Sequence, residues 1–256
     1  MQITLILAIL LPLFIESISG SDTQGARKLP AQNNTLFEHV GDIPLPPGFN
    51  RVEADPRSFG SWLRNIRISS DNTVYLFDGT KKRNQQAQFA VLQVPVGKKN
   101  LQQCADAVMR LRAAYLLKFN RRSEIWFRDN AGKKYQCPAS GDSANFERYL
   151  EKVYGFCGTS SLARQLKPVR DFTRLKSGDV LIKGGFPGHA VIVMDVAVNK
   201  SGQKIFMIAQ SYMPAQSIHI LKNPSLDVIS PWYEVQSMSA INTPEWEFTS
   251  NQLMEW

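Results

Sequence analysis

The feature that most constrains the fold is a change in hydrophobic period along the chain near Pro168. Before it, apolar residues recur at three- and four-residue steps, the pattern of amphipathic helices. Helices are predicted at 100–118, 142–155 and 160–166. After Pro168, the chain has β-branched and apolar runs bounded by turn residues, which are typical of strands. Similar runs occur upstream of the predicted helices. Strands are predicted at 73–77, 88–96, 180–182, 190–196, 204–210 and 217–221.

Helices followed by a run of strands predict an α+β domain, with helices packed on one face of a mostly antiparallel sheet. The hydrophobic content of 43% in 256 residues is enough for a sizeable core. The aromatic residues near the C-terminus, Trp232, Tyr233, Trp246 and Phe248, are expected to cover an edge of this sheet.

The N-terminus carries an apolar run, Ile3 to Ile15, followed by small residues up to Gly20. This is the pattern of a secretory signal peptide, although no Lys or Arg precedes the run. A membrane anchor is the alternative, but the run is shorter than the ~20 apolar residues that span a bilayer. We therefore expect a signal peptide at 1–19, a flexible lead-in at 20–36 and one domain at 37–256. The mature protein would be exported, periplasmic or secreted, without stable membrane insertion.

The net charge, the Cys and His counts and the basic runs limit the possible ligands and partners. The net charge of +8 favours an anionic partner without naming one. Three His and three Cys, scattered along the chain, do not match a zinc pattern, and no phosphate-binding or dinucleotide-binding glycine motif occurs, so neither metal nor cofactor is predicted. Dispersed basic runs are interpreted as solvated turns, so no nucleic-acid partner is expected. They are Lys81-Lys82-Arg83, Arg121-Arg122 and Lys133-Lys134.

Cys104 is the first candidate catalytic residue, because it falls in the first turn of the helix predicted at 100–118. A helix N-terminus presents free N–H groups and a partial positive charge, which lower the pKa of a thiol and can stabilise an oxyanion. The alternative is that Cys104 is a small apolar residue of the helix stripe.

His189 is the second candidate, because it follows the turn Phe186-Pro187-Gly188 and opens a predicted strand. An imidazole at a strand end can accept the proton of a thiol. The alternative is an ordinary surface histidine. His39 has no such setting, and His219 alternates with isoleucines, which predicts a solvent-facing strand residue.

The third candidate would orient His189. Gln210, at the end of the next strand, could accept a hydrogen bond from the ring, and Ser211 takes that role if the strand's parity is reversed. Asp195 shares the parity of His189 but lies about 20 Å along the strand, at about 3.3 Å per residue, which is too far for contact.

Two sequence segments carry a resemblance to a known superfamily. Lys176-Ser177-Gly178-Asp179-Val180 precedes Gly188-His189-Ala190-Val191-Ile192-Val193, downstream of a helix-start Cys104. This order resembles the NlpC-type and CHAP-type papain-like cysteine hydrolases. The resemblance implies a papain-like fold, a nucleophile at Cys104 and a base at His189, whereas Gln210 departs from the His, Asn or Glu usual at the third position.

A closer resemblance, over most of 59–246, is to an exported bacterial family known as domain of unknown function 4846. It rests on three segments, which are 102–112, 187–193 and 209–216. The combined interpretation is an exported cysteine hydrolase that cleaves an amide bond, with a cell-wall (peptidoglycan) peptide as the substrate class. The alternatives are a noncatalytic binding protein with the same fold, and an acyltransferase that uses the same thioester. If Cys104 stays a thiol, Cys137 and Cys157 could form a disulfide or remain free.

Overall fold

The computed structural model describes residues 37–235 and 240–256. The chain divides into two units, Met1–Gln32 and Asn33–Trp256, and every described residue belongs to the second. The signal peptide and most of the lead-in predicted for 1–36 lie outside the described residues. Within the described part, no helix combines the length and the apolar character needed to cross a membrane.

A large antiparallel sheet dominates this unit, and in the described residues it has nine strands. Its main path runs β2, β9, β8, β7, β6, β13, β5, while β1 pairs with β7 and β10 with β8. In that order the bounds are Gln88–Val91, His219–Leu221, Lys204–Gln210, His189–Asn199, Val180–Lys183, Leu253–Glu255, Lys167–Pro168, Phe49–Arg51 and Tyr233–Glu234. Two separate hairpins are β3 (Trp126–Arg128) with β4 (Lys134–Gln136) and β11 (Ala240–Asn242) with β12 (Glu247–Thr249).

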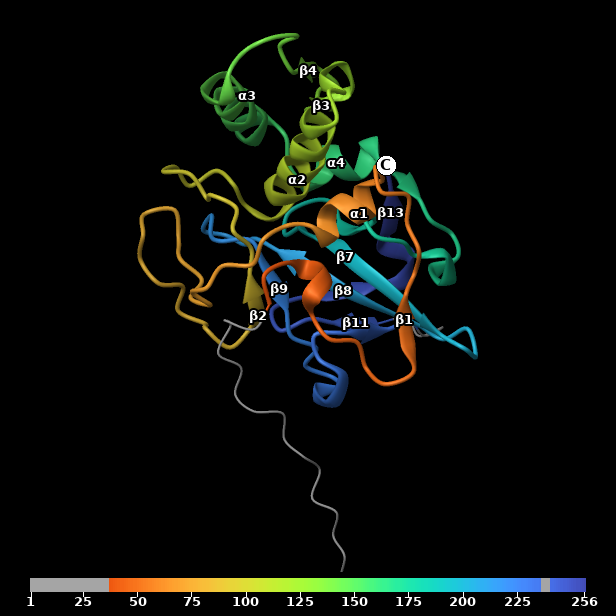
Figure 1. Ribbon diagram of the computed structural model, residues 1–256. Coiled ribbons are helices and arrows are strands. Elements are labelled where there is room, and N and C mark those ends of the chain that lie inside the picture. Colours follow the sequence, from red (N-terminus) through yellow and green to blue (C-terminus); the bar gives the residue numbers. More distant parts are fainter. Residues whose placement is uncertain (1–36, 236–239) are drawn as a thin grey trace, which may run out of the picture. The chain divides into compact units, whose positions relative to one another are not determined.

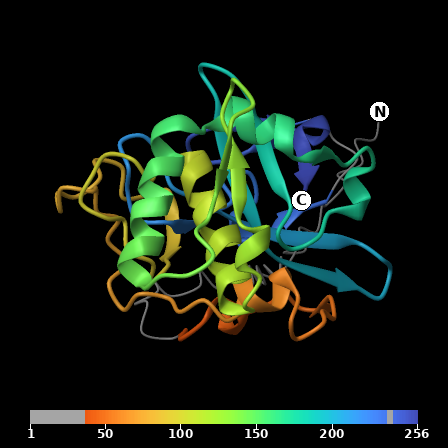
Figure 2. The same cartoon turned by 90° about the horizontal axis from the view of Figure 1, so that it is seen from above.

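Four α-helices occur in the described chain, and they are α1 (Phe59–Arg64), α2 (Cys104–Lys118), α3 (Ser143–Phe156) and α4 (Thr159–Gln165). Figures 1 and 2 show α2, α3 and α4 with the β3–β4 hairpin on one side of the long strands β7 and β8. Local caps fix the helix starts. The Asp142 side chain accepts from the Asn145 N–H at 2.8 Å, and Asp106 Oδ2 accepts from the Gln103 N–H at 3.0 Å.

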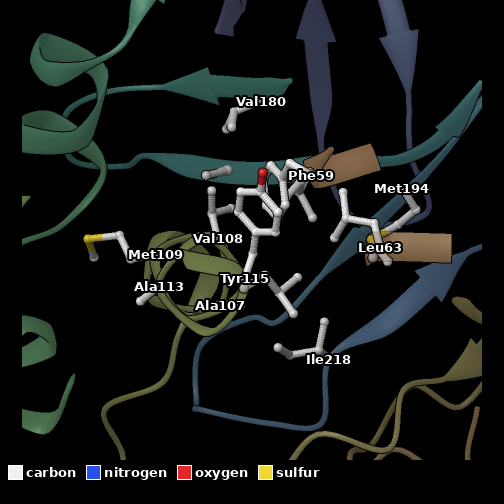
Figure 3. Close-up of a cluster of buried hydrophobic side chains, with 14 of the residues drawn as sticks. Phe59, Leu63, Ala107, Val108, Met109, Ala113, Tyr115, Val180, Met194 and Ile218 are labelled. Atoms are coloured by element: carbon white, nitrogen blue, oxygen red, sulfur yellow. The ribbon is translucent and has the colours of Figure 1, made fainter. Parts of the chain in front are cut away.

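The face of the sheet under the helices forms the larger core. Alternate residues of β7, Ala190, Ile192 and Met194, pack with residues of α1 and α2. Figure 3 shows Val108 and Tyr115 of α2 beside Phe59 of α1. The expected α+β architecture, with helices on one face of a mostly antiparallel sheet, is confirmed.

The opposite face of the sheet is covered too. Val191 and Val193 of β7 belong to a second buried cluster, together with Phe248 of β12 and Leu253 of β13. The C-terminal strand β13 pairs with both β6 and β5. The C-terminal segment therefore helps to cover this face of the sheet as well as extending it, whereas Trp232 packs in the larger core on the other face.

Three predicted elements differ from the structure. The strand predicted at 88–96 spans only Gln88–Val91. The segment 73–77 is not a strand, because Leu76 donates to Thr80 O at 2.7 Å in a tight turn, and Tyr75 and Leu76 make only isolated bridges. The helix predicted to begin at Asn100 begins at Cys104. Asn100 does not cap it, because Asn100 Oδ1 accepts instead from the Ala215 N–H at 2.8 Å.

Candidate active site

Cys104 is the first residue of α2, which packs against β7. Its sulfur lies against the backbone N–H groups of Ala105 and Ala190, in addition to its own. Ala190 can contact the sulfur because β8 ends at Gln210. The register of Ile192 with Ala209 would place Ala190 opposite Ser211, just beyond the end of the strand.

The pKa of Cys104 is raised to about 11, mainly by burial and further by the nearby Asp106. The backbone N–H groups act in the opposite direction but do not outweigh the loss of solvent. The lowered pKa predicted from the helix N-terminus is therefore corrected, because burial disfavours the thiolate. As a whole residue, Cys104 is partly exposed, whereas Cys137 and Cys157 are buried.

His189 opens β7 and is almost fully buried, with 2% of its surface exposed. The backbone before it is tightly packed, since a Cβ on Gly188 would lie 2.4 Å from Thr159 Oγ1. Three aromatic rings surround the imidazole, at centroid distances of 4.7 Å for Tyr212, 5.2 Å for Trp246 and 5.7 Å for Phe248. Burial lowers the pKa of His189 to about 4 despite its hydrogen bond with Gln210, so the ring is neutral.

Gln210 is the hydrogen-bond partner of His189. Its Oε1 lies 2.8 Å from His189 Nε2, and both residues are buried. Because this contact occupies Nε2, Nδ1 remains, and no described residue forms a hydrogen bond with it. Ser211 does not take this role. Its hydroxyl lies 2.9 Å from each of two carbonyl oxygens, those of Gln102 and Gln216.

A partly buried charge lies behind Gln210. Glu245 Oε2 accepts from Gln210 Nε2 at 2.8 Å and from Lys82 Nζ at 2.5 Å. Asn84 Nδ2 donates to the other carboxylate oxygen at 3.1 Å. Burial opposes ionisation of Glu245, but Lys82 and Asn84 outweigh it and hold the pKa below its usual value. A chain of contacts thus runs from His189 through Gln210 and Glu245 to Lys82.

His219 belongs to the same cluster, and the prediction that it faces solvent is wrong. It has no exposed surface, because the C-terminal segment covers this face of the sheet. Its Nδ1 lies 2.8 Å from Ser217 O and its Nε2 lies 3.4 Å from Gln210 Nε2. Burial lowers its pKa to about 4.

In the described residues, Cys104 and His189 do not form a hydrogen bond with each other, but they have neighbouring residues in common. Ala190 follows His189 in the chain and contacts the thiol. The Tyr212 ring packs on His189, and the charge of a Cys104 thiolate would act on the pKa of Tyr212, which burial raises. By strand alternation, His189 and Gln210 lie on the same face of the sheet as Val191 and Ile208, opposite the face against which α2 packs.

Other singled-out residues lie elsewhere. Asp195 forms ion pairs with Arg51 at 2.7 Å and Arg64 at 2.5 Å, away from His189. Cys137 and Cys157 are free thiols, so the possible disulfide is absent. Cys137 Sγ instead contacts Arg122 at 3.8 Å.

Lys82 and Glu245 are members of this site that sequence reasoning does not identify. The sequence places Lys82 in a solvated basic turn, yet only 9% of it is exposed, because Glu245 binds its ammonium group. Glu245 lies in a loop between β11 and β12, with no local pattern around it. The one sequence signal for Glu245 is its position next to Trp246, which belongs to the aromatic segment predicted to cover the sheet. Among the described residues no group of three or more His, Cys, Asp or Glu could hold a metal ion.

The fold and site together define a class: an α+β protein with a large antiparallel sheet, a thiol at a helix start and a buried His–Gln pair at a strand end. A family model described as domain of unknown function (4846) matches residues 41–138 and 129–255. The chain belongs to this family. No curated protein and no solved structure gives a significant match.

Proposed function

We propose that this protein is an exported cysteine hydrolase of the papain-like type that cleaves an amide bond through Cys104 and His189. The observation that carries the proposal is the contact of His189 Nε2 with Gln210 Oε1 at 2.8 Å. It orients the ring and leaves Nδ1 as the nitrogen that would act as a base, while Cys104, at the start of α2, would supply the thiol. A cell-wall peptide is the substrate class suggested by the sequence resemblance.

The resting site favours a neutral thiol and a neutral imidazole. With a pKa of about 11 for Cys104 and about 4 for His189, a preformed thiolate–imidazolium pair is disfavoured. Proton transfer would therefore accompany bond formation. As Cys104 Sγ bonds to the substrate carbonyl carbon, His189 Nδ1 takes the thiol proton, and the carbonyl electron pair moves onto oxygen.

The oxyanion would be stabilised by the N–H groups at the start of α2, which point toward the sulfur. On its collapse, the C–N bond breaks and the imidazolium gives its proton to the leaving amine, which leaves a thioester on Cys104. Water then attacks the thioester, His189 accepts a proton from it, and the acid and the free thiol are released. If an amine takes the place of water, the same thioester gives acyl transfer.

The first test is acylation by p-nitrophenyl acetate, which needs no knowledge of the natural substrate. We expect nitrophenolate release together with an acetyl group on the peptide containing Cys104, and neither in Cys104→Ser. His189→Ala should slow acylation by ~100-fold, the lower end of general-base contributions. His39→Ala, a partly exposed histidine outside the site, is the matched control.

Absence of acylation above the Cys104→Ser background, or equal rates for the wild type and His189→Ala, would overturn the hydrolase and favour the noncatalytic binding protein. Adding glycine amide as an acceptor separates the two enzymatic alternatives. A hydrolase releases mainly acetate, whereas an acyltransferase releases mainly acetylated glycine amide.

A further inference from the structure

We infer that Glu245 is a positioning residue that sets the tautomer of His189 through the side-chain amide of Gln210. The inference rests on the proposed function, because the tautomer of His189 matters for catalysis only if His189 acts as a base. The tautomer itself follows from which atoms can donate and which can accept in four side chains, Glu245, Gln210, His219 and His189.

The first step is that Glu245 only accepts. Lys82 Nζ at 2.5 Å and Asn84 Nδ2 at 3.1 Å both donate to its carboxylate, which is the arrangement of an ionised group. The group of Gln210 that faces Glu245 at 2.8 Å must therefore be the NH₂. This contact fixes which end of the amide is nitrogen.

The second step is that His219 accepts the other hydrogen of the same NH₂. His219 Nδ1 lies 2.8 Å from Ser217 O, and a carbonyl oxygen can only accept, so the proton of this neutral ring is on Nδ1. Nε2 then carries a lone pair, 3.4 Å from Gln210 Nε2. Two acceptors thus share the two hydrogens of Gln210, and both require the same amide orientation.

The third step is that Gln210 Oε1 faces His189 and can only accept. The His189 proton must then be on Nε2, 2.8 Å away, and its lone pair on Nδ1. Nδ1 is the nitrogen that the proposed mechanism uses as a base. The orientation of this base is thus determined by two groups that do not touch it, mainly by Glu245 at 2.8 Å from the amide and secondarily by His219 at 3.4 Å.

The same geometry explains why position 210 is a glutamine. A glutamate there would bring two carboxylates to about the 2.8 Å that now separates Gln210 Nε2 from Glu245 Oε2, and like charges at that distance share a proton. The amide transmits the acceptor character of Glu245 to His189 without a second negative charge.

The experiment is NMR of the folded protein labelled with ¹⁵N-histidine, because long-range ¹H–¹⁵N correlations distinguish the two neutral tautomers. We expect opposite tautomers for the two buried histidines, with His189 protonated on Nε2 and His219 on Nδ1. Variants His189→Gln and His219→Gln assign the signals. A wild-type His189 protonated on Nδ1 would overturn the inference, and this measurement requires no variant of Glu245 to fold.

The second measurement removes the carboxylate together with its buried cation, in Lys82→Met/Glu245→Met. Replacing a buried ion pair by apolar side chains often preserves stability. The remaining contact of the amide with His219 is long, at 3.4 Å, and does not hold its orientation alone. We therefore expect His189 to lose its single tautomer and give averaged ¹⁵N shifts, and acylation of Cys104 to slow by about tenfold or more, as on loss of an orienting partner. Glu247→Gln, an exposed carboxylate two residues away, should change neither.

An unchanged His189 tautomer in the folded double variant would overturn the role of Glu245. The two proposals fail separately. If the tautomers are as stated but Cys104 is not acylated, the positioning network stands and the hydrolase fails. If Cys104 is acylated but His189 is protonated on Nδ1, the hydrolase stands and the positioning role of Glu245 fails.

Discussion

At the residue scale, burial and local charge compete for each ionisable group of the site, and the outcome differs between them. Burial dominates at Cys104 and His189, and both stay neutral. At Glu245 the nearby Lys82 outweighs burial, and the carboxylate stays charged. A sequence identifies which group lies at a helix start, but the solvent that remains around it depends on segments far away in the chain.

The pKa of Cys104, about 11, predicts how its alkylation depends on pH. Because the thiolate is the reactive form, the iodoacetamide rate at Cys104 should rise by about tenfold per pH unit from 7 to 10. Cys104 should still react faster than the buried Cys137 and Cys157, which serve as controls in the same digest. Peptide mapping by mass spectrometry measures all three. A plateau already reached near pH 7 would contradict the raised pKa.

His219 predicts a loss of stability in acid. Burial lowers its pKa from 6.5 to about 4, so the stabilisation it gives is complete above pH 6.5 and declines as pH falls toward 4. The stability advantage of the wild type over His219→Gln should therefore shrink by about 2 kcal/mol between about pH 7.5 and 4.5.

Urea unfolding of both proteins at both pH values measures this difference. The wild type must be compared with the variant because other groups also change the free energy of unfolding with pH. Burial raises the pKa of Asp179 to about 7, so Asp179 adds stability as pH falls, and it does so equally in the wild type and in His219→Gln. The variant His39→Gln is the control. A difference that is constant with pH would contradict the prediction.

At the element scale, strong periodicity is enough to predict the helices and central strands. The helix predicted at 142–155 is Ser143–Phe156, and the strand predicted at 204–210 is Lys204–Gln210. The predictions that fail depend on tertiary structure. Alternation predicts an exposed His219, but the second face of the sheet is covered by a C-terminal segment that carries little periodic signal.

The candidate site is predictable to a similar extent. Turn residues and strand ends point to His189 and Gln210, and the structure places these two in contact. Glu245 and Lys82 could not be found this way, because their pairing joins segments distant in sequence, a loop between short strands and a basic run. Such a contact leaves no local pattern.

Gly188 predicts a test of how the turn before β7 positions His189. A Cβ there would lie 2.4 Å from Thr159 Oγ1 and 2.5 Å from Gly185 O, so Gly188→Ala should destabilise by about 1–3 kcal/mol and slow acylation of Cys104. Gly155→Ala in α3 is the matched control. No atom lies within 4 Å of its added Cβ, and it should stabilise by up to about 1 kcal/mol. Urea unfolding measures both, and equal effects would contradict the packing argument.

At the scale of the whole molecule, the N-terminal apolar run predicts processing on export. Protein recovered from outside the cytoplasm should begin at Gly20 or Ser21. N-terminal sequencing or intact mass measures this. Replacing Leu7 in the apolar run by Arg should block export and leave residue 1 in place. An exported protein that retains Met1 would contradict the signal peptide and favour the membrane anchor.

The two groups of the proposed chemistry belong to different layers: the thiol lies at the start of α2, which packs against β7, whereas the imidazole packs against Trp246 and Phe248 of the C-terminal segment. Residues from 82 to 248 contribute to the cluster, so it requires segments that lie far apart in the sequence. No N-terminal fragment or half-assembled domain holds the complete arrangement. Under the proposed function, a partly folded chain would lack the oriented His189 base, and activity would appear only when the domain is completely folded.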